Sequence, residues 1–396
     1  PPAPALPSRP AEAFNPSPAL YDDFHIQNFA MGSISACFGP DYEVFEGRRI
    51  PRTPNGDLKL FNRVVEINAE RLQFDGKPNL VTEYDVPVDA WYTEKNSYPT
   101  MPYSVLMEIA LQPCGFLSAY VGSTLPYADD DFYFRNLDGD GRYHRDFDVR
   151  GKTIRNHVTL LASTSLKGII IQKFSFVMSV DGELYYEGTA VFGYFEPDSL
   201  KNQVGLDAGK DVLPWYKQED VSGLDVRELD LAQRTDLVAG NASTPHYRLA
   251  GGQLNFIDKV ITIPNGGREG KGYVFAERNI DPSDWFFSCH FYQDPVMPGS
   301  LGVEAILEAM QTYALDQNLG VHLQNPYFTH QDHHQVVWIY RGQISPNDPQ
   351  MYLEVDITNV ESNADQVIVT GNASIWKTGM RIYEVKDISI RLVGQG

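Results

Sequence analysis

Between residues 301 and 310, apolar side chains fall on almost every side of a helical projection. A helix that is apolar all round is expected to be buried. Pro298, Gly299 and Ser300 come just before this stretch and suit the first turn of a helix. The pattern therefore predicts a buried helix that begins next to Pro298.

Alternation of apolar and polar residues predicts antiparallel strands in both halves of the chain. In the first half, the alternating stretches Ile169–Val180 and Glu183–Phe195 flank Asp181-Gly182, which is a strong hairpin signal. The second half has three alternating stretches and a turn at Lys377–Gly379: Met351–Val360, Gln366–Ile375 and Arg381–Val393. We expect an antiparallel sheet with one buried helix in each half.

The two halves repeat each other at an offset of 196 residues. Leu58–Ile67 parallels Leu254–Ile263, and the Met-Pro pair at 101–102 parallels the pair at 297–298. At this offset Glu108 corresponds to Glu304. A repeat of this length predicts two copies of one fold.

Two stretches read as connections. Residues 1–19 are rich in Pro and Ala and are expected to be a linker. Residues 198–245 are polar and acidic and are expected to bridge the copies, with one short helix near Val226–Arg234. This leaves a first unit at 20–197 and a second at 246–396. The absence of an initial methionine suggests a segment of a longer protein.

Composition narrows the classes of function. The net charge of −20 argues against nucleic acid and against anionic membrane surfaces. Cys37, Cys114 and Cys289 give neither a disulfide framework nor metal-ligand spacing, which suits a reducing, cytoplasmic environment. The sequence contains no signal peptide and no long apolar span, so we expect a soluble protein.

The candidate chemistry centres on His290, which follows an aromatic run and precedes a Pro- and Gly-containing segment, 294–299. The start of a buried helix presents unpaired N–H groups and the positive end of a dipole. Gly299 would allow a ligand to approach that backbone closely. A thioester carbonyl placed there would have its developing enolate charge stabilised, and His290 could remove a proton beside it.

The motif His-Phe-x-x-Asp-Pro-Val-Met-Pro-Gly-x-Leu-Gly at 290–302 resembles the 3-hydroxydecanoyl-ACP dehydratase/isomerase family. That family has the hotdog fold, so the resemblance implies an α+β protein with a double hotdog: two fused copies, each a long helix wrapped by an antiparallel sheet. It implies that His290 is the catalytic base, that Gly299 supplies an oxyanion N–H and that the Val296 carbonyl orients His290. It implies no cofactor.

The halves are not equivalent. The first half has no histidine at 91–102, and Tyr103 stands where the second half has Gly299. Its helix nevertheless carries Glu108 and Gln112, which match the Asp/Glu-x-x-x-Gln pattern of dehydratase helices. In the dimeric family, histidine and acid come from different subunits. The resemblance therefore pairs His290 with Glu108, which Gln112 would orient. Glu304, on the other helix, is a secondary candidate that we expect to be structural.

The implied reaction is dehydration of 3-hydroxyacyl-ACP thioesters to 2-enoyl-ACP. The family's usual acid is Asp, and the Glu found here leaves double-bond isomerisation open. A histidine in the second half, together with the linker, makes the chain resemble a dehydratase didomain of a polyunsaturated fatty acid synthase. The implied partners are the acyl carrier protein domains of that synthase, which bear the substrate on phosphopantetheine, and a second copy within the parent synthase. The densest basic run, a candidate docking patch, is Arg48, Arg49, Arg52, Lys59 and Arg63.

Other interpretations remain. A hotdog thioesterase would use Glu108 or Glu304 to activate water, and a structural didomain would have no activity. Cys289 would be a packed thiol, because neighbours on a strand point to opposite faces. A calcium loop at 138–143 is excluded by Arg142 and Tyr143. One cluster resembles a metal site, but we interpret it as a solvated loop: His330, Asp332, His333 and His334.

Overall fold

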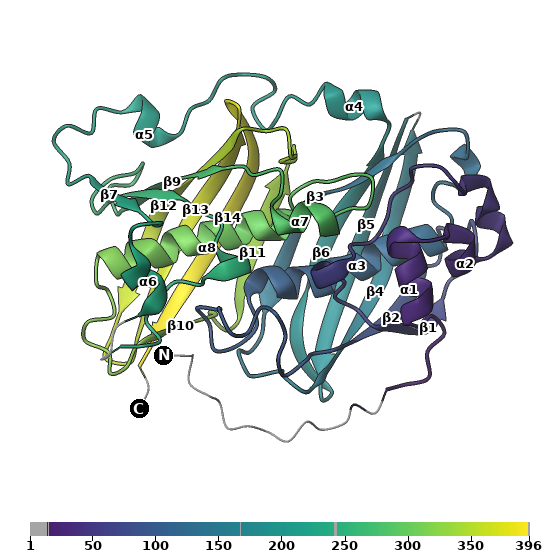
Figure 1. The fold of residues 1–396 in the computed structure, drawn as a ribbon, viewed down its shortest axis with the longest axis horizontal. Helices are drawn as coiled ribbons and strands as arrows, with labels where there is room; N and C mark the ends of the chain where they lie inside the picture. Colours follow the sequence, from purple (N-terminus) through teal and green to yellow (C-terminus); the bar gives the residue numbers. More distant parts are fainter. Residues whose placement is uncertain (1–13, 15, 167, 241–243, 395–396) are drawn as a thin grey trace.

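The computed structural model describes residues 14, 16–166, 168–240 and 244–394. Most of the expected linker at 1–19 lies outside these residues. Within them, fourteen strands form one antiparallel sheet that runs through both halves (Figure 1). The order along the sheet is β1-β2-β4-β5-β6-β3-β11-β14-β13-β12-β9-β8-β7, with β10 paired to β14.

The strands of the two halves form two contiguous blocks of this sheet. The first block contains β1 (Arg63–Asn68), β2 (Asn79–Asp85), β3 (Tyr133–Tyr143), β4 (Thr153–Leu166), β5 (Ile169–Val180) and β6 (Glu183–Phe195). The second contains β7 (Arg227–Asp230), β8 (Lys259–Ile263), β9 (Tyr273–Asn279), β10 (Tyr327–Thr329), β11 (His334–Tyr340), β12 (Gln350–Ser362), β13 (Gln366–Lys377) and β14 (Met380–Val393).

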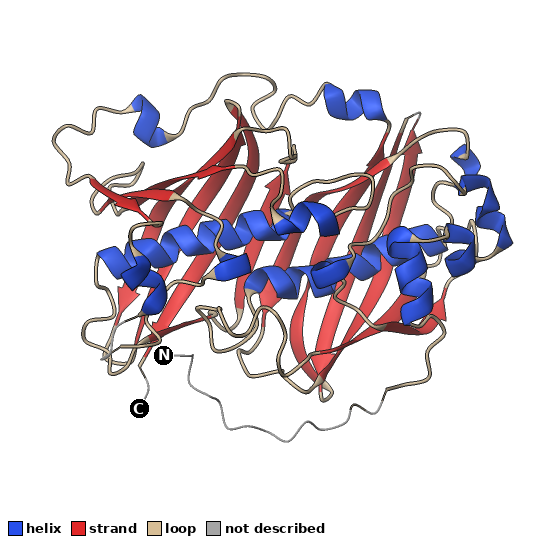
Figure 2. Ribbon diagram, viewed as in Figure 1, coloured by secondary structure: helices blue, strands red, loops and turns tan. Residues whose placement is uncertain are grey.

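The blocks join through β3 and β11, which pair antiparallel with Asp140 opposite Val337. Two long helices, α3 (Tyr103–Tyr120) and α8 (Gly299–Asp316), lie across one face of the sheet, one over each block (Figure 2). Each copy is thus a long helix on an antiparallel sheet. The prediction of an α+β double hotdog is confirmed.

Shorter helices lie around this frame. The first half has α1 (Asp23–Met31), α2 (Ile34–Phe38) and the 3₁₀ turns η1 (Pro40–Phe45), η2 (Gly56–Leu58) and η3 (Leu125–Tyr127). The remaining ones are α4 (Pro197–Lys201), α5 (Trp215–Gln218), α6 (Thr235–Ala239), η4 (Gly252–Leu254) and α7 (Trp285–Cys289).

The two long helices correspond closely in length and in where they begin. Both have 18 residues, and both begin directly after the proline of a Met-Pro pair, at Pro102 and Pro298. Their first residues, Tyr103 and Gly299, are separated by the 196 residues of the sequence repeat. Nearly every residue of both helices is buried, as their apolar sequences predict.

The predicted hairpins are confirmed. The strands β5 and β6 have the expected bounds, and the turn residues Asp181 and Gly182 have φ angles of 54° and 82°. Both angles are positive, as a tight turn between right-twisted strands requires. The predicted turn after β13 is formed by Thr378 and Gly379, which also have positive φ angles.

Two local predictions are wrong. Residues 227–230 form β7, not a helix, because this segment pairs with β8 and buries Leu229 against the core. Cys289 and His290 do not lie on a strand: Cys289 ends α7 and His290 is its C-cap. Cys289 is still a packed thiol, since it is buried and does not line the cavity described below.

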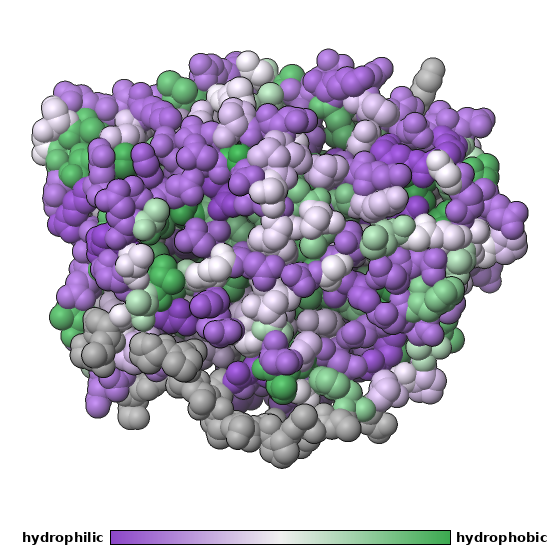
Figure 3. All heavy atoms as spheres, in the orientation of Figure 1, coloured by the Kyte–Doolittle hydropathy of each residue, from purple (hydrophilic) through white to green (hydrophobic). Residues whose placement is uncertain are grey.

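The described helices include none that combines the length and the apolar character needed to cross a bilayer. The face drawn in Figure 3 is mostly hydrophilic, and its apolar residues are scattered in small groups.

Candidate active site

A cavity of about 310 Å³ lies where α3 and α8 meet at the seam between the halves. The first half contributes Glu108 and Gln112 to its wall, and the second half contributes His290, Val296 and Gly299. Five of the six residues singled out from the sequence therefore lie around one space. Glu304 does not line it.

His290 is oriented by the loop that follows it. Its Nδ1 lies 3.0 Å from the Val296 carbonyl oxygen, and the Val296 N–H donates back to the His290 carbonyl at 2.8 Å. A carbonyl only accepts, so Nδ1 carries the hydrogen and Nε2 keeps a lone pair. The pKa of His290 is lowered to about 3, chiefly by burial and to a lesser extent by the charge of Arg135, against an opposing effect of the Val296 hydrogen bond. The imidazole is therefore a neutral base at ordinary pH.

Glu108 is buried in α3 and receives two hydrogen bonds. Ser300 Oγ donates to its Oε1 at 2.5 Å, and Gln112 Nε2 donates to its Oε2 at 2.9 Å. Burial raises the pKa of Glu108, while these two hydrogen bonds act in the opposite direction. A carboxyl whose pKa is raised in a dry site can serve as a proton donor.

Gln112 is itself fixed by the backbone. Its Nε2 donates to the Leu58 carbonyl at 2.7 Å, and its Oε1 accepts from the Leu60 N–H at 3.0 Å. The amide therefore cannot rotate freely, and its contact with Glu108 holds that carboxyl in one orientation.

Gly299 is the first residue of α8, so its N–H has no acceptor within the helix. A Cβ added at Gly299 would lie 2.5 Å from Cε2 of Tyr340. The packing of Tyr340 therefore requires a glycine at this position. The Tyr340 hydroxyl is buried and has no hydrogen-bond partner in the part of the chain that the structure describes. Sequence analysis missed this residue.

The space beside Glu304 that corresponds to the cavity beside Glu108 is filled by other residues. Glu304 Oε2 accepts from the Ser104 N–H at 2.9 Å, and Tyr103 stands where the other half has Gly299. His330 stacks on Tyr98 with the ring centroids 4.3 Å apart. The small cavity beside Tyr103 and His330 has about 20 Å³, which is room for about one water.

The prediction of a solvated histidine-rich loop is wrong for His330. His330 is buried, and its Nε2 bonds to the Met101 carbonyl at 2.8 Å, because the ring fills the space beside Tyr98. His333 is exposed, as expected. Asp332 binds Arg391 and the Asp146 N–H instead of approaching these rings. Among the described residues, no group of three or more His, Cys, Asp or Glu side chains is arranged to hold a metal ion.

The basic run does not form the open patch that we considered. Arg63 is buried in ion pairs with Glu83 and Asp85. Arg48 pairs with Asp131, Lys59 pairs with Asp23, Arg52 donates to three carbonyls at the end of α1, and Arg49 lies over the Tyr133 ring. Most of these basic side chains are therefore paired with nearby acids or backbone carbonyls.

The cavity wall has an apolar part and several polar groups without a hydrogen-bond partner among the described residues. Leu111, Gly115, Phe134 and Phe192 form the apolar part. The side-chain atoms that line the cavity, are buried and have no partner among the described residues are Arg52 Nε, Thr53 Oγ1, Arg135 Nε, Tyr340 OH and Gln343 Oε1. Buried polar atoms are costly to leave unpaired, so this wall is suited to a ligand with both apolar and polar parts.

The second half matches the family model described as "FabA-like domain" over residues 249–386. This half is a FabA-like domain. The matched span of the FabA-like domain contains His290, Val296, Gly299 and Glu304. Glu108 and Gln112 lie outside it, in the first copy.

Nearly the whole chain also resembles part of one long protein, a polyunsaturated fatty acid synthase polypeptide of Thraustochytrium sp. (strain ATCC 26185 / S-3). The two are 36% identical over 384 residues, which is 93% of this chain. The chain spans 26% of that relative's length.

Solved structures with a related shape have little sequence in common with the chain. The dehydratase domain from the CurJ module of curacin polyketide synthase is 10% identical, with a TM-score of 0.46, over 84% of this chain and 96% of that one. The 12:0-ACP thioesterase from Umbellularia californica is 9% identical, with a TM-score of 0.41, over 80% of this chain and 94% of that one. These likenesses do not distinguish one reaction from another.

Proposed function

We propose that this chain dehydrates 3-hydroxyacyl thioesters to 2-enoyl thioesters. The observation that carries the proposal is that a neutral histidine from one half and a buried acid from the other, His290 and Glu108, line one cavity. Removal of water from a 3-hydroxyacyl group needs a base at C2 and a proton donor at the C3 hydroxyl. This cavity offers one of each.

In the proposed reaction, Nε2 of His290 takes a proton from C2, and Glu108 gives its proton to the departing hydroxyl. The C2–H and C3–O bonds break, the C2–C3 double bond forms, and water leaves. The thioester oxygen, which gains charge, lies against the Gly299 N–H at the positive end of α8. A proton passing from His290 to Glu108 restores the starting state.

The environments of the two groups support these roles. A histidine with a lowered pKa is unprotonated and ready to act as a base, and a carboxyl with a raised pKa keeps its proton. Both groups are side chains of this chain, so the proposed reaction needs no cofactor.

We infer that the substrate arrives on the phosphopantetheine arm of an acyl carrier protein within a polyunsaturated fatty acid synthase. The similarity to a polypeptide of such a synthase supports this inference. The wall supports it too, because an acyl chain suits Leu111 and Phe134, while an amide-bearing arm suits the unpaired groups of Thr53 and Gln343. A cytoplasmic location, a second copy held through the parent synthase and weak docking of a separate carrier are parts of the same proposal.

The test is mass spectrometry of carrier-bound 3-hydroxyacyl thioesters before and after incubation with the chain. We expect the acyl group to lose one water, and we expect a folded His290→Ala variant to lose this activity by more than about tenfold. Release of free carrier thiol would instead indicate a thioesterase. An unchanged substrate would favour a structural didomain.

A further inference from the structure

An ion pair beside the cavity crosses the seam between the halves. Arg135, in β3, donates from Nη1 to Oδ2 of Asp294 at 2.6 Å and from Nη2 to Oδ1 at 2.8 Å. Asp294 belongs to the second half, in the loop between α7 and α8. The two side chains are only 11% and 12% exposed. A two-bond pair of this kind fixes both the distance and the direction between its partners.

The loop that carries Asp294 also carries His290. The loop closes on itself, since the Val296 N–H donates to the His290 carbonyl, and Phe291 and Asp294 exchange backbone hydrogen bonds at 2.9 and 3.1 Å. Residues 290–296 thus form a compact unit, and Asp294 is a point at which this unit is attached to the first half. That attachment, together with the hydrogen bonds from Asn55 to the Cys289 carbonyl, holds His290 relative to Glu108.

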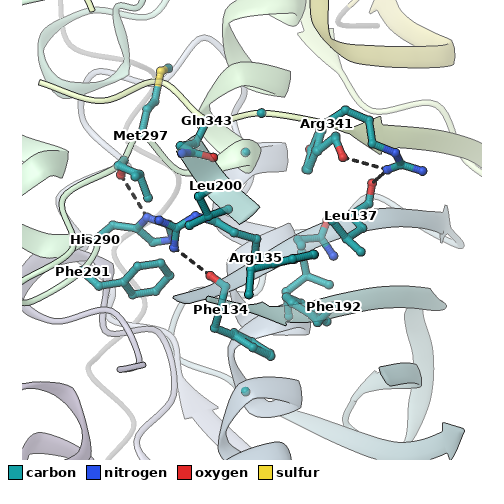
Figure 4. A pocket seen from close by; sticks show the side chains of 18 of the residues that line it. Phe134, Arg135, Leu137, Phe192, Leu200, His290, Phe291, Met297, Arg341 and Gln343 are labelled. Carbon is teal, nitrogen blue, oxygen red and sulfur yellow. Dashed lines mark hydrogen bonds between the residues drawn. The ribbon is translucent and has the colours of Figure 1, made fainter. Parts of the chain in front are cut away.

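The charge of Arg135 acts on His290 as well. In Figure 4 the Arg135 side chain extends from its strand toward His290, and its positive charge adds to the larger effect of burial in lowering the pKa of His290. Cys289 precedes His290 in the chain. The other charged or titratable residues that line the cavity are Arg52, Glu108, Tyr340, Arg341 and Tyr383. Of the charged side chains, only Arg135 contributes to this shift.

We propose that Arg135 is a positioning residue of this site: through Asp294 it docks the His290 loop onto the first half, and it places its own positive charge near the imidazole. The inference rests on the proposed function, in which the neutral imidazole is the base. Asp294 has two roles: it anchors the loop, and it balances the charge of Arg135.

This arrangement predicts opposite effects from the two partners of one ion pair. Arg135→Gln removes the positive charge and leaves Asp294 negative, so the pKa of His290 should rise. Asp294→Asn leaves Arg135 unbalanced, so the pKa of His290 should not rise. A role confined to docking, with no effect of the Arg135 charge on His290, predicts something different: either change would loosen the loop, admit water and raise the pKa of His290 in both variants.

The experiment is an NMR titration of the His290 imidazole in the parent, Arg135→Gln and Asp294→Asn chains, together with kcat/KM for dehydration. We expect an upward shift only for Arg135→Gln, with kcat/KM reduced by about 10²-fold as the base is misplaced. An unchanged pKa in Arg135→Gln, or an equal rise in both variants, would overturn the inference. If Arg135→Gln does not fold, Asp294→Asn decides alone, because a rise in that variant contradicts the proposal.

A matched control comes from a second two-bond pair. Arg381 binds Asp207 through Nε at 3.0 Å and Nη2 at 2.6 Å, and neither residue lines this cavity. Arg381→Gln should leave the His290 titration unchanged. The NMR readout does not depend on turnover, so a parent chain that fails to dehydrate while its variants titrate as expected would refute only the proposed function.

Discussion

Ser300 Oγ, in the first turn of α8, donates a 2.5 Å hydrogen bond to Oε1 of Glu108 in the second turn of α3. The reciprocal contact joins the Ser104 N–H, in the first turn of α3, to Glu304 in α8. Each helix therefore presents its beginning to the acid of the other. The two contacts differ in what lies beside them: His290 and a cavity at the first, and packed aromatic rings at the second.

The pH dependence of turnover should reflect two groups shifted in opposite directions. His290 would lose its basic form only as the pH falls to about 3. Glu108 would lose its proton as the pH rises through a pKa that burial has raised. We therefore expect kcat/KM for dehydration to be level through the mildly acidic range and to fall on the alkaline side. A rise in kcat/KM through about pH 6.5, typical of an unperturbed histidine, would contradict this account.

Ser300→Ala should move the alkaline fall to higher pH. The Ser300 hydrogen bond stabilises the ionised form of Glu108 and so lowers its pKa, against the larger effect of burial. Removing this bond raises the pKa further, and the protonated acid then persists to higher pH. The check is kcat/KM against pH for the parent and the variant. A fall that stays in place would mean that another group titrates there.

Glu308→Gln should stabilise the fold, and the gain should grow with pH. Glu308 occupies the position of Gln112 and accepts from the Phe256 N–H at 2.7 Å, but its Oε1 is buried with no partner among the described residues. Burial raises its pKa from 4.5 to about 8. The folded state therefore holds a proton that the unfolded chain has lost, and the associated stability fades as pH rises from about 4.5 through about 8.

The uncharged amide introduced by Glu308→Gln makes no such pH-dependent contribution to stability. Urea unfolding at about pH 5 and about pH 8 should show the gap between Glu308→Gln and the parent widening by a few kcal/mol. The mirror change, Gln112→Glu, should make stability more sensitive to pH. A gap that stays constant with pH would show that Glu308 is not protonated in the folded state.

Gly299→Ala should damage both packing and turnover. The added Cβ would lie 2.5 Å from Tyr340 Cε2, so the ring would have to move, at a cost of about 1–3 kcal/mol. Gly223→Ala is a suitable control, because an added Cβ there meets nothing within 4 Å. Thermal unfolding and initial dehydration rates would be compared for both variants. A Gly299→Ala chain with the stability and the rate of the parent would show that Tyr340 does not constrain this position.

Local signals account for most of what the sequence predicted. The β5–β6 hairpin follows from alternation around Asp181-Gly182, and the starts of α3 and α8 follow from the Met-Pro pairs. The repeat at 196 residues was visible because both copies retain the Met-Pro pair and the matching stretches Leu58–Ile67 and Leu254–Ile263. The prediction of a helix near 226–234 was wrong because the pairing of β7 with β8 is a tertiary contact. The four residues of β7 are too few to show an alternating strand pattern.

The missed residues act over long distances in the chain. Arg135 and Asp294 are 159 positions apart, and nothing in the sequence around either residue marks the other. Tyr340 and Gly299 meet because the fold brings the end of β11 to the start of α8. The burial of His330 beside Tyr98 and the pairing of Arg63 with Glu83 have the same origin. A sequence motif identifies a candidate base, but neighbours brought in by the fold determine its pKa.

The comparison of Glu108→Gln with Glu304→Gln tests the central claim most directly. Both residues are buried acids at matching positions of α3 and α8, and both changes keep the shape of the side chain. The measurement is the initial rate of water loss from a carrier-bound 3-hydroxyacyl thioester. If His290 and Glu108 form the one working site, Glu108→Gln should reduce the rate by about 10²–10⁴-fold and Glu304→Gln should leave it nearly unchanged. A large loss in Glu304→Gln with little change in Glu108→Gln would contradict the pairing of the two halves.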